Sequence, residues 1–267
     1  MKKLMLGNEA IARGAYEAGV RVVSSYPGTP STEITEFMAK YDEIYCEWAP
    51  NEKVAVETAS GASLAGGRAV SAMKHVGLNV AADPLFTMSY IGVNAGLVLC
   101  VADDPGMHSS QNEQDSRNYA LASKIPMLEP ADSGECKDYM KKAFSLSEEF
   151  DTPVLMRLTT RVAHSQSLVE VCEREDLPLK PYEKNIAKNV MVPANARPKH
   201  PAVEARTEQL SAFLETSDLN KVIMRDTDIG IITAGISYQY VEEALPNASV
   251  LKLGMVWPLP ENLIRDF

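Results

Sequence analysis

The chain has 267 residues, with 26 basic and 36 acidic side chains, a formal net charge of −10 and a hydrophobic fraction of 45%. The acidic balance excludes the clustered Lys and Arg of a nucleic-acid-binding surface, and no run of about 18 apolar residues is present to cross a membrane. At roughly 100–200 residues per domain, the length predicts one large domain, or one domain plus part of another. Four cysteines without a CxxC pair suit a cytoplasmic, reducing compartment.

The first 165 residues alternate helical and strand patterns. Helices are expected at 8–18, from Ser31 onward, and at 51–64, 79–90, 116–122 and 132–150; strands are expected at 20–25, 44–48, 68–73, 96–102 and 153–158. Asn8 and Ser31 suit helix N-caps. Strands that alternate with helices indicate parallel βαβ units, and strands that are apolar throughout indicate a sheet covered on both faces. We therefore predict an α/β fold with a parallel sheet and ligands beyond the carboxyl ends of its strands.

A different pattern begins near residue 166. Residues 166–225 are charged and rich in proline, so we expect a linker with one helix at 203–214. The α/β pattern then returns, with strands at 229–235 and 250–253, a helix at 238–245, and a last helix opened by Pro258-Leu259-Pro260. The sequence thus predicts a first domain at 1–165, a linker at 166–225 and the beginning of a second α/β domain at 226–267.

The best-known catalytic and cofactor-binding signatures are absent. No GxGxxG follows a strand, and there is no GxxxxGK[ST], HExxH or GxSxG. The four histidines lack the spacing of metal ligands. We therefore predict no metal site within these residues.

The segment Tyr26-Pro27-Gly28-Thr29-Pro30 follows an expected strand and precedes an expected helix. Its two prolines restrict the backbone around Gly28 and Thr29, so that one hydroxyl lies at the carboxyl end of the strand. That geometry could bind a carboxylate. An ordinary turn favours the same residue types, and both interpretations remain open.

Glu52 lies in the first turn of the helix expected at 51–64. The helix dipole favours a glutamate there in any protein. The alanine, glycine and serine residues that follow indicate that another group packs closely against this helix. Glu57, more than a turn further along, is the weaker candidate for a functional carboxylate.

Two later segments also follow expected strands. Lys74–Asn79 is expected to be a loop in which Gly77 allows a close backbone approach. His108–Tyr119 is strongly polar, which is typical of a solvated loop. Arg117, at the start of the helix that follows, is unfavourable for the helix dipole and therefore indicates an anionic partner.

Four strings, in this order, carry a resemblance over nearly the whole chain: SYPGTPSTEI, APNEKVAVETASGASLAGGRAVSAMKHVGLN, DDPGMHSSQNEQDSRNYA and IGIITAGISYQYVEEALPNASVLKLGMVWPLPENLIRDF. The chain resembles the 2-oxoacid:ferredoxin oxidoreductases that use thiamine diphosphate, most closely the α subunit of the indolepyruvate type. The resemblance implies oxidative decarboxylation of indolepyruvate and other aryl pyruvates to aryl-acetyl-CoA, with reduction of ferredoxin. Two alternatives remain: a subunit of a non-oxidative thiamine-dependent decarboxylase, and a non-catalytic subunit scaffold.

The resemblance also implies roles for single residues. Glu52, matched by its nine-residue spacing to Gly61-Ala62, would hydrogen-bond N1′ of the cofactor's aminopyrimidine. A carboxyl group there stabilises the imino tautomer, which takes the proton from the thiazolium C2 carbon. Thr29 and Arg117 would contact the substrate carboxylate, and the residue at Gly28 would influence substrate choice. The remaining residues expected to contact the cofactor are Pro27, Gly28, His75, Gly77, Leu78 and Asn79.

The chain departs from the family in two respects. It has no GDG motif to hold the diphosphate and Mg²⁺, and no cysteine-rich segment for iron–sulfur clusters. We therefore expect missing domains or a partner subunit to supply these groups. We also expect homodimerisation, electron transfer to ferredoxin by the complete enzyme, and no activity from this chain alone.

Overall fold

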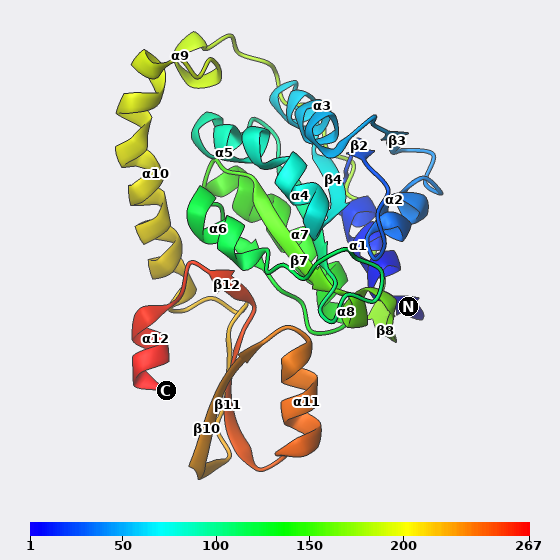
Figure 1. Ribbon diagram of the computed structural model, residues 1–267, viewed down its shortest axis with the longest axis vertical. Helices are drawn as coiled ribbons and strands as arrows, with labels where there is room; N and C mark the ends of the chain where they lie inside the picture. Colours follow the sequence, from blue (N-terminus) through cyan, green and yellow to red (C-terminus); the bar gives the residue numbers. More distant parts are fainter.

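The computed structural model describes residues 1–267 and contains one seven-stranded sheet at its centre (Figure 1). The strand order is β12-β6-β7-β5-β4-β2-β3; β12 (Met255–Trp257) is antiparallel to its neighbour and the others are parallel. The parallel strands are β2 (Val22–Ser25), β3 (Tyr45–Trp48), β4 (Ala69–Lys74), β5 (Leu97–Asp103), β6 (Met127–Leu128) and β7 (Val154–Thr159). The predicted α/β fold is confirmed.

Helices cover both faces of this sheet. Side chains of β5 alternate between two cores: Val98 and Cys100 lie in one, and Leu97 and Leu99 lie in the other. Such a strand is apolar throughout because neither of its faces meets water. The first core is completed by α1 (Gly7–Glu17), α2 (Thr32–Met38) and α7 (Ser133–Glu149), and the second by α3 (Glu52–Leu64), α4 (His75–Val80), α5 (Ala82–Ile91) and α6 (Arg117–Ser123).

The order of the strands reverses beside β2. The chain passes from β2 to β3 on one side and then to β4 on the other side. At such a switch point the two connections diverge and leave a crevice beyond the carboxyl ends of the strands, where ligands of open α/β sheets bind. Ser25, the last residue of β2, accepts hydrogen bonds from Thr35 Oγ1 (2.8 Å) and from the backbone N–H of Ala72 (3.0 Å). This buried hydroxyl therefore links α2 and β4 to β2 directly below the crevice.

Two strands far apart in the sequence form a separate antiparallel pair. β1 (Lys2–Leu6) pairs with β8 (Gln166–Glu170), which follows the short helix α8 (Thr160–His164). The sequence patterns predicted neither strand. Their pairing brings the first residues of the chain to the end of the predicted first domain.

The remaining elements begin with two helices, α9 (Ile186–Asn189) and α10 (Pro193–Leu214), and α10 packs along α5 (Figure 1). The helix predicted at 203–214 is ten residues longer than expected and contains Pro198 and Pro201. A three-stranded sheet follows, in the order β10-β11-β9. Its members and flanking helices are β9 (Lys221–Ile223), β10 (Asp226–Ala234), α11 (Ile236–Ala244), β11 (Ala248–Leu253) and α12 (Glu261–Asp266).

The C-terminal elements are joined to the central sheet. β12 pairs with β6, although it lies in the region predicted to begin a second domain. Lys252 of β11 is almost fully buried and forms an ion pair with Glu135 of α7, and the backbone N–H of Glu129 donates to the carbonyl of Gly254 at 2.9 Å. The division into three regions at residues 165 and 225 stays a prediction. None of the helices combines the length and apolar character that crossing a membrane requires.

Three local predictions need correction. Asn8 does not cap its helix, which begins at Gly7; its side chain donates instead to the carbonyl of Pro30 at 2.8 Å. Ser31 stands at the N-cap position of α2, as predicted, but its hydroxyl donates to the carbonyl of Gly28 at 2.7 Å and makes no capping hydrogen bond. The predicted loop Lys74–Asn79 is helical from His75 onward, because α4 continues directly from β4 and precedes α5.

Replacing Ser25 by alanine should lower the free energy of unfolding by about 1–3 kcal/mol, because a buried donor from Thr35 and one from Ala72 lose their acceptor. Urea denaturation measures this change. Ser145→Ala on the exposed face of α7 is the matched control and should leave the midpoint unchanged. Equal midpoints for the two variants would show that Ser25 does not stabilise the base of the crevice.

Candidate functional site

The turn after β2 forms one wall of the crevice. The N–H of Gly28 donates to Thr32 Oγ1 at 2.9 Å, and Ser31 and Asn8 bind the carbonyls of Gly28 and Pro30. These bonds fix the turn on both sides of Thr29, whose side chain is exposed. Pro27 is also exposed. The turn therefore holds Thr29, with its side chain exposed, beyond the carboxyl end of β2, and its contact with a substrate stays a prediction.

Glu52 lies at the start of α3, beyond the end of β3. Asn51 caps the helix by accepting a hydrogen bond from the N–H of Val54 at 3.0 Å. Glu52 as a whole residue is 8% exposed, and its carboxyl group makes no hydrogen bond or ion pair within the chain. The carboxyl group therefore keeps hydrogen-bonding capacity that no other group of the chain uses. A carboxyl group in this state is suited to a ligand that supplies the missing hydrogen bond.

Gly77 of α4 packs directly against this carboxyl group. A Cβ atom at Gly77 would lie 2.4 Å from Glu52 Oε1 and 2.7 Å from its Cγ. No side chain fits in that space while Glu52 stays in place. The next residue, Leu78, is fully buried in the core below α4. The structure thus brings together Glu52 and Gly77, two residues that the sequence assigned to one site.

Lys74 and His75, at the junction of β4 and α4, contact the neighbouring loops. The aliphatic part of the Lys74 side chain lies against Gly28, where an added Cβ atom would be 3.0 Å from Lys74 Cδ. Lys74 Nζ donates a hydrogen bond to the carbonyl of Ser109 at 2.8 Å. His75 is fully buried, and its Nε2 lies 3.0 Å from the carbonyl of Asn112. A carbonyl only accepts, so Nε2 donates. His75 Nδ1 is buried and has no partner.

The loop after β5 contacts Lys74 and His75, and Asp104 shapes it. This almost fully buried carboxylate accepts hydrogen bonds from the N–H of Ser109 (2.8 Å), from Ser110 Oγ (2.7 Å) and from Thr160 Oγ1 (2.8 Å). Burial alone would raise the pKa of Asp104, but the hydrogen bonds from Ser109, Ser110 and Thr160 outweigh it and lower the pKa to about 2.

A second buried carboxylate, Asp103, fixes the end of the same loop. Arg157 of β7 donates from Nε to Asp103 (2.7 Å) and forms an ion pair through Nη1 with Glu129 (2.7 Å). Asp103 also accepts from the N–H of Ser116 at 3.1 Å. Since Ser116 precedes α6, this network sets where Arg117 begins its helix.

Arg117 has an anionic partner within the chain. Its guanidinium binds Asp115 through Nε and Nη2, with distances of 2.7–3.0 Å, and its side chain is 49% exposed. On the same helix, Tyr119 donates a hydrogen bond to Asn79, which places the end of α4 beside α6. No hydrogen bond joins Arg117 to Thr29.

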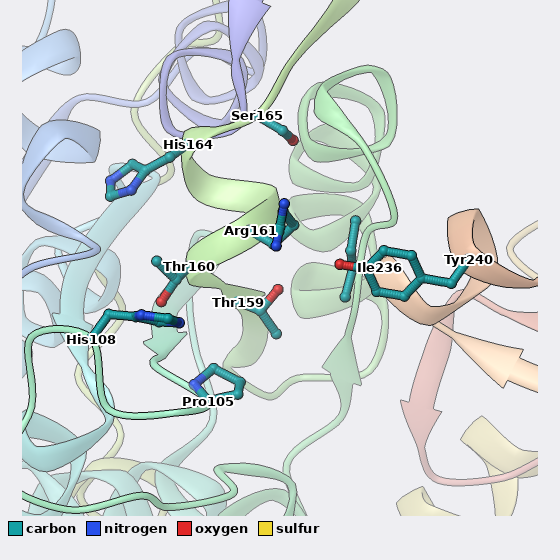
Figure 2. A pocket seen from close by; sticks show the side chains of 9 residues that line it. All are labelled: Pro105, His108, Thr159, Thr160, Arg161, His164, Ser165, Ile236 and Tyr240. Atoms are coloured by element: carbon teal, nitrogen blue, oxygen red, sulfur yellow. The ribbon is translucent and has the colours of Figure 1, made fainter. Parts of the chain in front are cut away.

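A cavity of about 600 Å³ lies beside this loop, between the carboxyl ends of β5 and β7 and the helix α11 (Figure 2). The Thr159 hydroxyl is buried without a partner and points toward it. None of the site residues predicted from the sequence lines this cavity. The cavity therefore does not coincide with the site predicted from the sequence, although both lie at the same edge of the sheet.

Comparison with known protein families decides the assignment. Residues 13–225 match the model described as pyruvate flavodoxin/ferredoxin oxidoreductase, thiamine diphosphate-binding. The chain belongs to this family. The matched part is a thiamine diphosphate-binding domain, and it contains all the site residues predicted from the sequence.

Curated relatives agree with the family. The indolepyruvate oxidoreductase subunit IorA of Archaeoglobus fulgidus is 47% identical over 280 residues, covering 100% of this chain and 45% of the relative. The Pyrococcus horikoshii subunit of the same name is 46% identical, covering 100% of this chain and 43% of the relative. The 2-oxoglutarate synthase subunit KorA of A. fulgidus is 24% identical, with 99% and 84% covered. The chain spans about half the length of the IorA relatives.

A solved structure shows the same fold. The 2-oxoglutarate:ferredoxin oxidoreductase from Magnetococcus marinus, with 2-oxoglutarate, coenzyme A and succinyl-CoA bound, superimposes with a TM-score of 0.81 at 19% identity. The match covers 100% of this chain and 56% of that one. The likeness extends through the C-terminal elements of this chain as well as the central sheet.

Sequence reasoning missed several residues that shape the site, chiefly Lys74, Asp104 and Arg157. A pair of aspartates directly after a fully apolar strand was a usable signal for Asp104, because buried carboxylates need donors. Lys74 belongs to a segment that the sequence predicts as a loop, whereas in the structure it is the last residue of β4. Arg157 carried no local signal, since its partners lie 28 or more positions away in the sequence.

Replacing Gly77 by alanine should displace the Glu52 carboxyl group, because the added Cβ would overlap it. We expect affinity for thiamine diphosphate to fall about tenfold or more, as measured by calorimetry on the assembled oxidoreductase. Gly61→Ala is the matched control on α3, where a Cβ meets nothing within 4 Å. Unchanged affinity in Gly77→Ala would show that the contact with Glu52 does not matter for binding.

The low pKa of Asp104 gives a pH dependence with a defined sign. A carboxyl group whose pKa is lowered on folding stabilises the protein above its unfolded value of 3.8, and this contribution is lost as the pH falls toward about 2. Asp104→Asn should therefore remove part of the loss of stability between pH 4 and pH 2, in unfolding curves recorded at several pH values. The same slope in both proteins would contradict the assignment.

Proposed function

We propose that the chain forms the aminopyrimidine side of the thiamine diphosphate site in an oxidoreductase that oxidatively decarboxylates indolepyruvate and other aryl pyruvates. The observation that carries the proposal is the carboxyl group of Glu52, a largely buried residue, which has no partner in the chain and packs against Gly77 beside the switch point of the sheet. The substrate class is supported by the relatives at 44–47% identity, whose printed names are indolepyruvate oxidoreductase.

The residues present fit the cofactor. Glu52 offers a carboxyl group that has no hydrogen-bond partner in the chain, and His75 Nδ1 is a buried polar atom without a partner. Glu52 would share a proton with N1′ of the pyrimidine, while the glycine at position 77 leaves room for the ring to approach. When bound, thiamine diphosphate supplies the carbon nucleophile that attacks the 2-oxoacid carbonyl. Around it we place the remaining predicted contacts, Pro27, Gly28, Leu78 and Asn79.

Thr29 and Arg117 would bind the substrate carboxylate. Thr29 lies in the turn that follows β2, and Arg117 lies at the start of α6 after the long loop that follows β5, so both are beyond the carboxyl ends of parallel strands. A guanidinium provides two parallel N–H donors for a carboxylate, and the exposed Thr29 hydroxyl adds a third donor. In the overall reaction, the 2-oxoacid and coenzyme A give the acyl-CoA, carbon dioxide and a proton, and the two electrons released reduce two ferredoxins.

We further propose that parts of the enzyme outside residues 1–267 hold the diphosphate, Mg²⁺ and the iron–sulfur clusters. The coverage of 43–45% of the IorA relatives supports this, as does their description as subunits. A partner subunit, homodimerisation and ferredoxin as electron acceptor belong to the same proposal. Four free cysteines, two of them fully buried, support a reducing compartment such as the cytoplasm.

Glu52→Gln tests the proposal in the assembled enzyme. The amide cannot hold the proton at N1′, so exchange of the C2 proton of thiamine diphosphate, followed by NMR, should slow by at least about a hundredfold. Glu57→Gln, an exposed glutamate on the same helix, is the matched control and should exchange normally. Near-normal exchange in Glu52→Gln would refute the assigned role of Glu52.

The oxidative reaction needs its own measurement. The assembled enzyme should reduce ferredoxin with indolepyruvate and coenzyme A, and it should release carbon dioxide in proportion. Release of carbon dioxide without reduction of ferredoxin would instead support a non-oxidative decarboxylase.

A further inference from the structure

The pairing of Arg117 with Asp115 uses only one edge of the guanidinium. Asp115 accepts from Nε at 2.9 and 3.0 Å and from Nη2 at 2.7 Å. The other terminal nitrogen, Nη1, makes no hydrogen bond in the structure. A guanidinium offers a second pair of parallel donors on its end, between Nη1 and Nη2, and this pair matches the two oxygens of a carboxylate. The Nη1 end of the Arg117 guanidinium therefore makes no hydrogen bond, whereas its Nε edge is bound to Asp115.

Asp115 lies next to the buried network of Asp103 and Arg157. Its backbone lies beside Ser116, whose N–H donates to the buried Asp103 at 3.1 Å. Arg157 Nε, which binds Asp103, also lies 3.8 Å from Asp115 Oδ1. Asp115 accepts a further hydrogen bond from the backbone N–H of Arg117 at 3.0 Å. The carboxylate is thus oriented by the backbone N–H of Arg117 and lies near the buried Arg157 guanidinium.

We propose that Asp115 is a positioning residue that holds the side of the Arg117 guanidinium and directs its free end toward the carboxylate of the 2-oxoacid. The inference rests on the proposed function, in which Arg117 contacts the substrate. A long arginine side chain that is half exposed has many rotamers, and ordering it in advance lowers the entropy lost on binding. Asp115 provides that order without occupying the donors that the substrate needs.

Stability is not a sufficient role for this pair. The side chains of Asp115 and Arg117 are 40% and 49% exposed, and ion pairs with such exposure contribute little to folding. The network of Asp103, Arg157 and Glu129 is buried and fixes the loop without Asp115. Loss of the Asp115 charge should therefore affect substrate binding much more than the melting temperature.

Asp115→Asn in the assembled enzyme tests the inference. The KM for the 2-oxoacid should rise about tenfold with kcat nearly unchanged, because the ordered guanidinium binds the carboxylate equally in the ground and transition states. The KM for coenzyme A and the melting temperature should stay the same, and Asp115→Glu should recover part of the affinity. Asp218→Asn removes an exposed carboxylate paired with Lys142 and is the matched control.

Arg117→Lys separates this inference from the function on which it rests. If Arg117→Lys leaves the KM for the 2-oxoacid unchanged, the proposed substrate contact is wrong. If Arg117→Lys raises that KM and Asp115→Asn does not, the substrate contact stands and the positioning role is wrong. If both raise it, the double variant should be no worse than Arg117→Lys alone, whereas additive effects would show that Asp115 acts independently of Arg117.

Discussion

The carboxyl group of Glu52 and the backbone of Gly77 occupy adjacent space with no room for a side chain between them. This contact joins the segment after β3 to the segment after β4, across the carboxyl end of β2. Glu52 has no partner of its own in the chain, so its carboxyl group is available to a bound group. The other predicted contacts lie in turns and helix starts that the strand order brings to the same edge of the sheet, and their grouping around this pair stays a prediction.

Two buried aspartates position the loop that follows β5. Asp103 and Asp104 are adjacent at the end of β5 and are both buried, and each collects its own donors. Asp104 shapes the beginning of the polar loop, while Asp103 fixes the start of α6 through Ser116 and Arg157. A long polar loop thereby takes a defined position although few of its side chains enter a core. Ordered loops on a rigid sheet are a common way to place binding groups.

The sequence allowed correct prediction of what depends on local pattern. Five of the seven strands of the central sheet (β2, β3, β4, β5 and β7), the helix α3 and the α/β class follow from apolar runs and their alternation with helical patterns. The pairing of β1 with β8, and of β12 with β6, joins segments more than 120 residues apart and has no local signal. Prolines 198 and 201 indicated a linker, yet α10 accommodates both on a largely exposed helix. Similarly, the pairing of Arg117 with Asp115 depends on the course of the loop, not on spacing alone.

A structure of the assembled oxidoreductase with thiamine diphosphate bound would show whether Glu52 binds the aminopyrimidine. We expect N1′ of the aminopyrimidine to lie within hydrogen-bond distance of the Glu52 carboxyl group, with the ring close to the backbone of Gly77. An aminopyrimidine bound elsewhere, with Glu52 turned toward solvent or hydrogen-bonded to another protein group, would contradict the assigned role of Glu52.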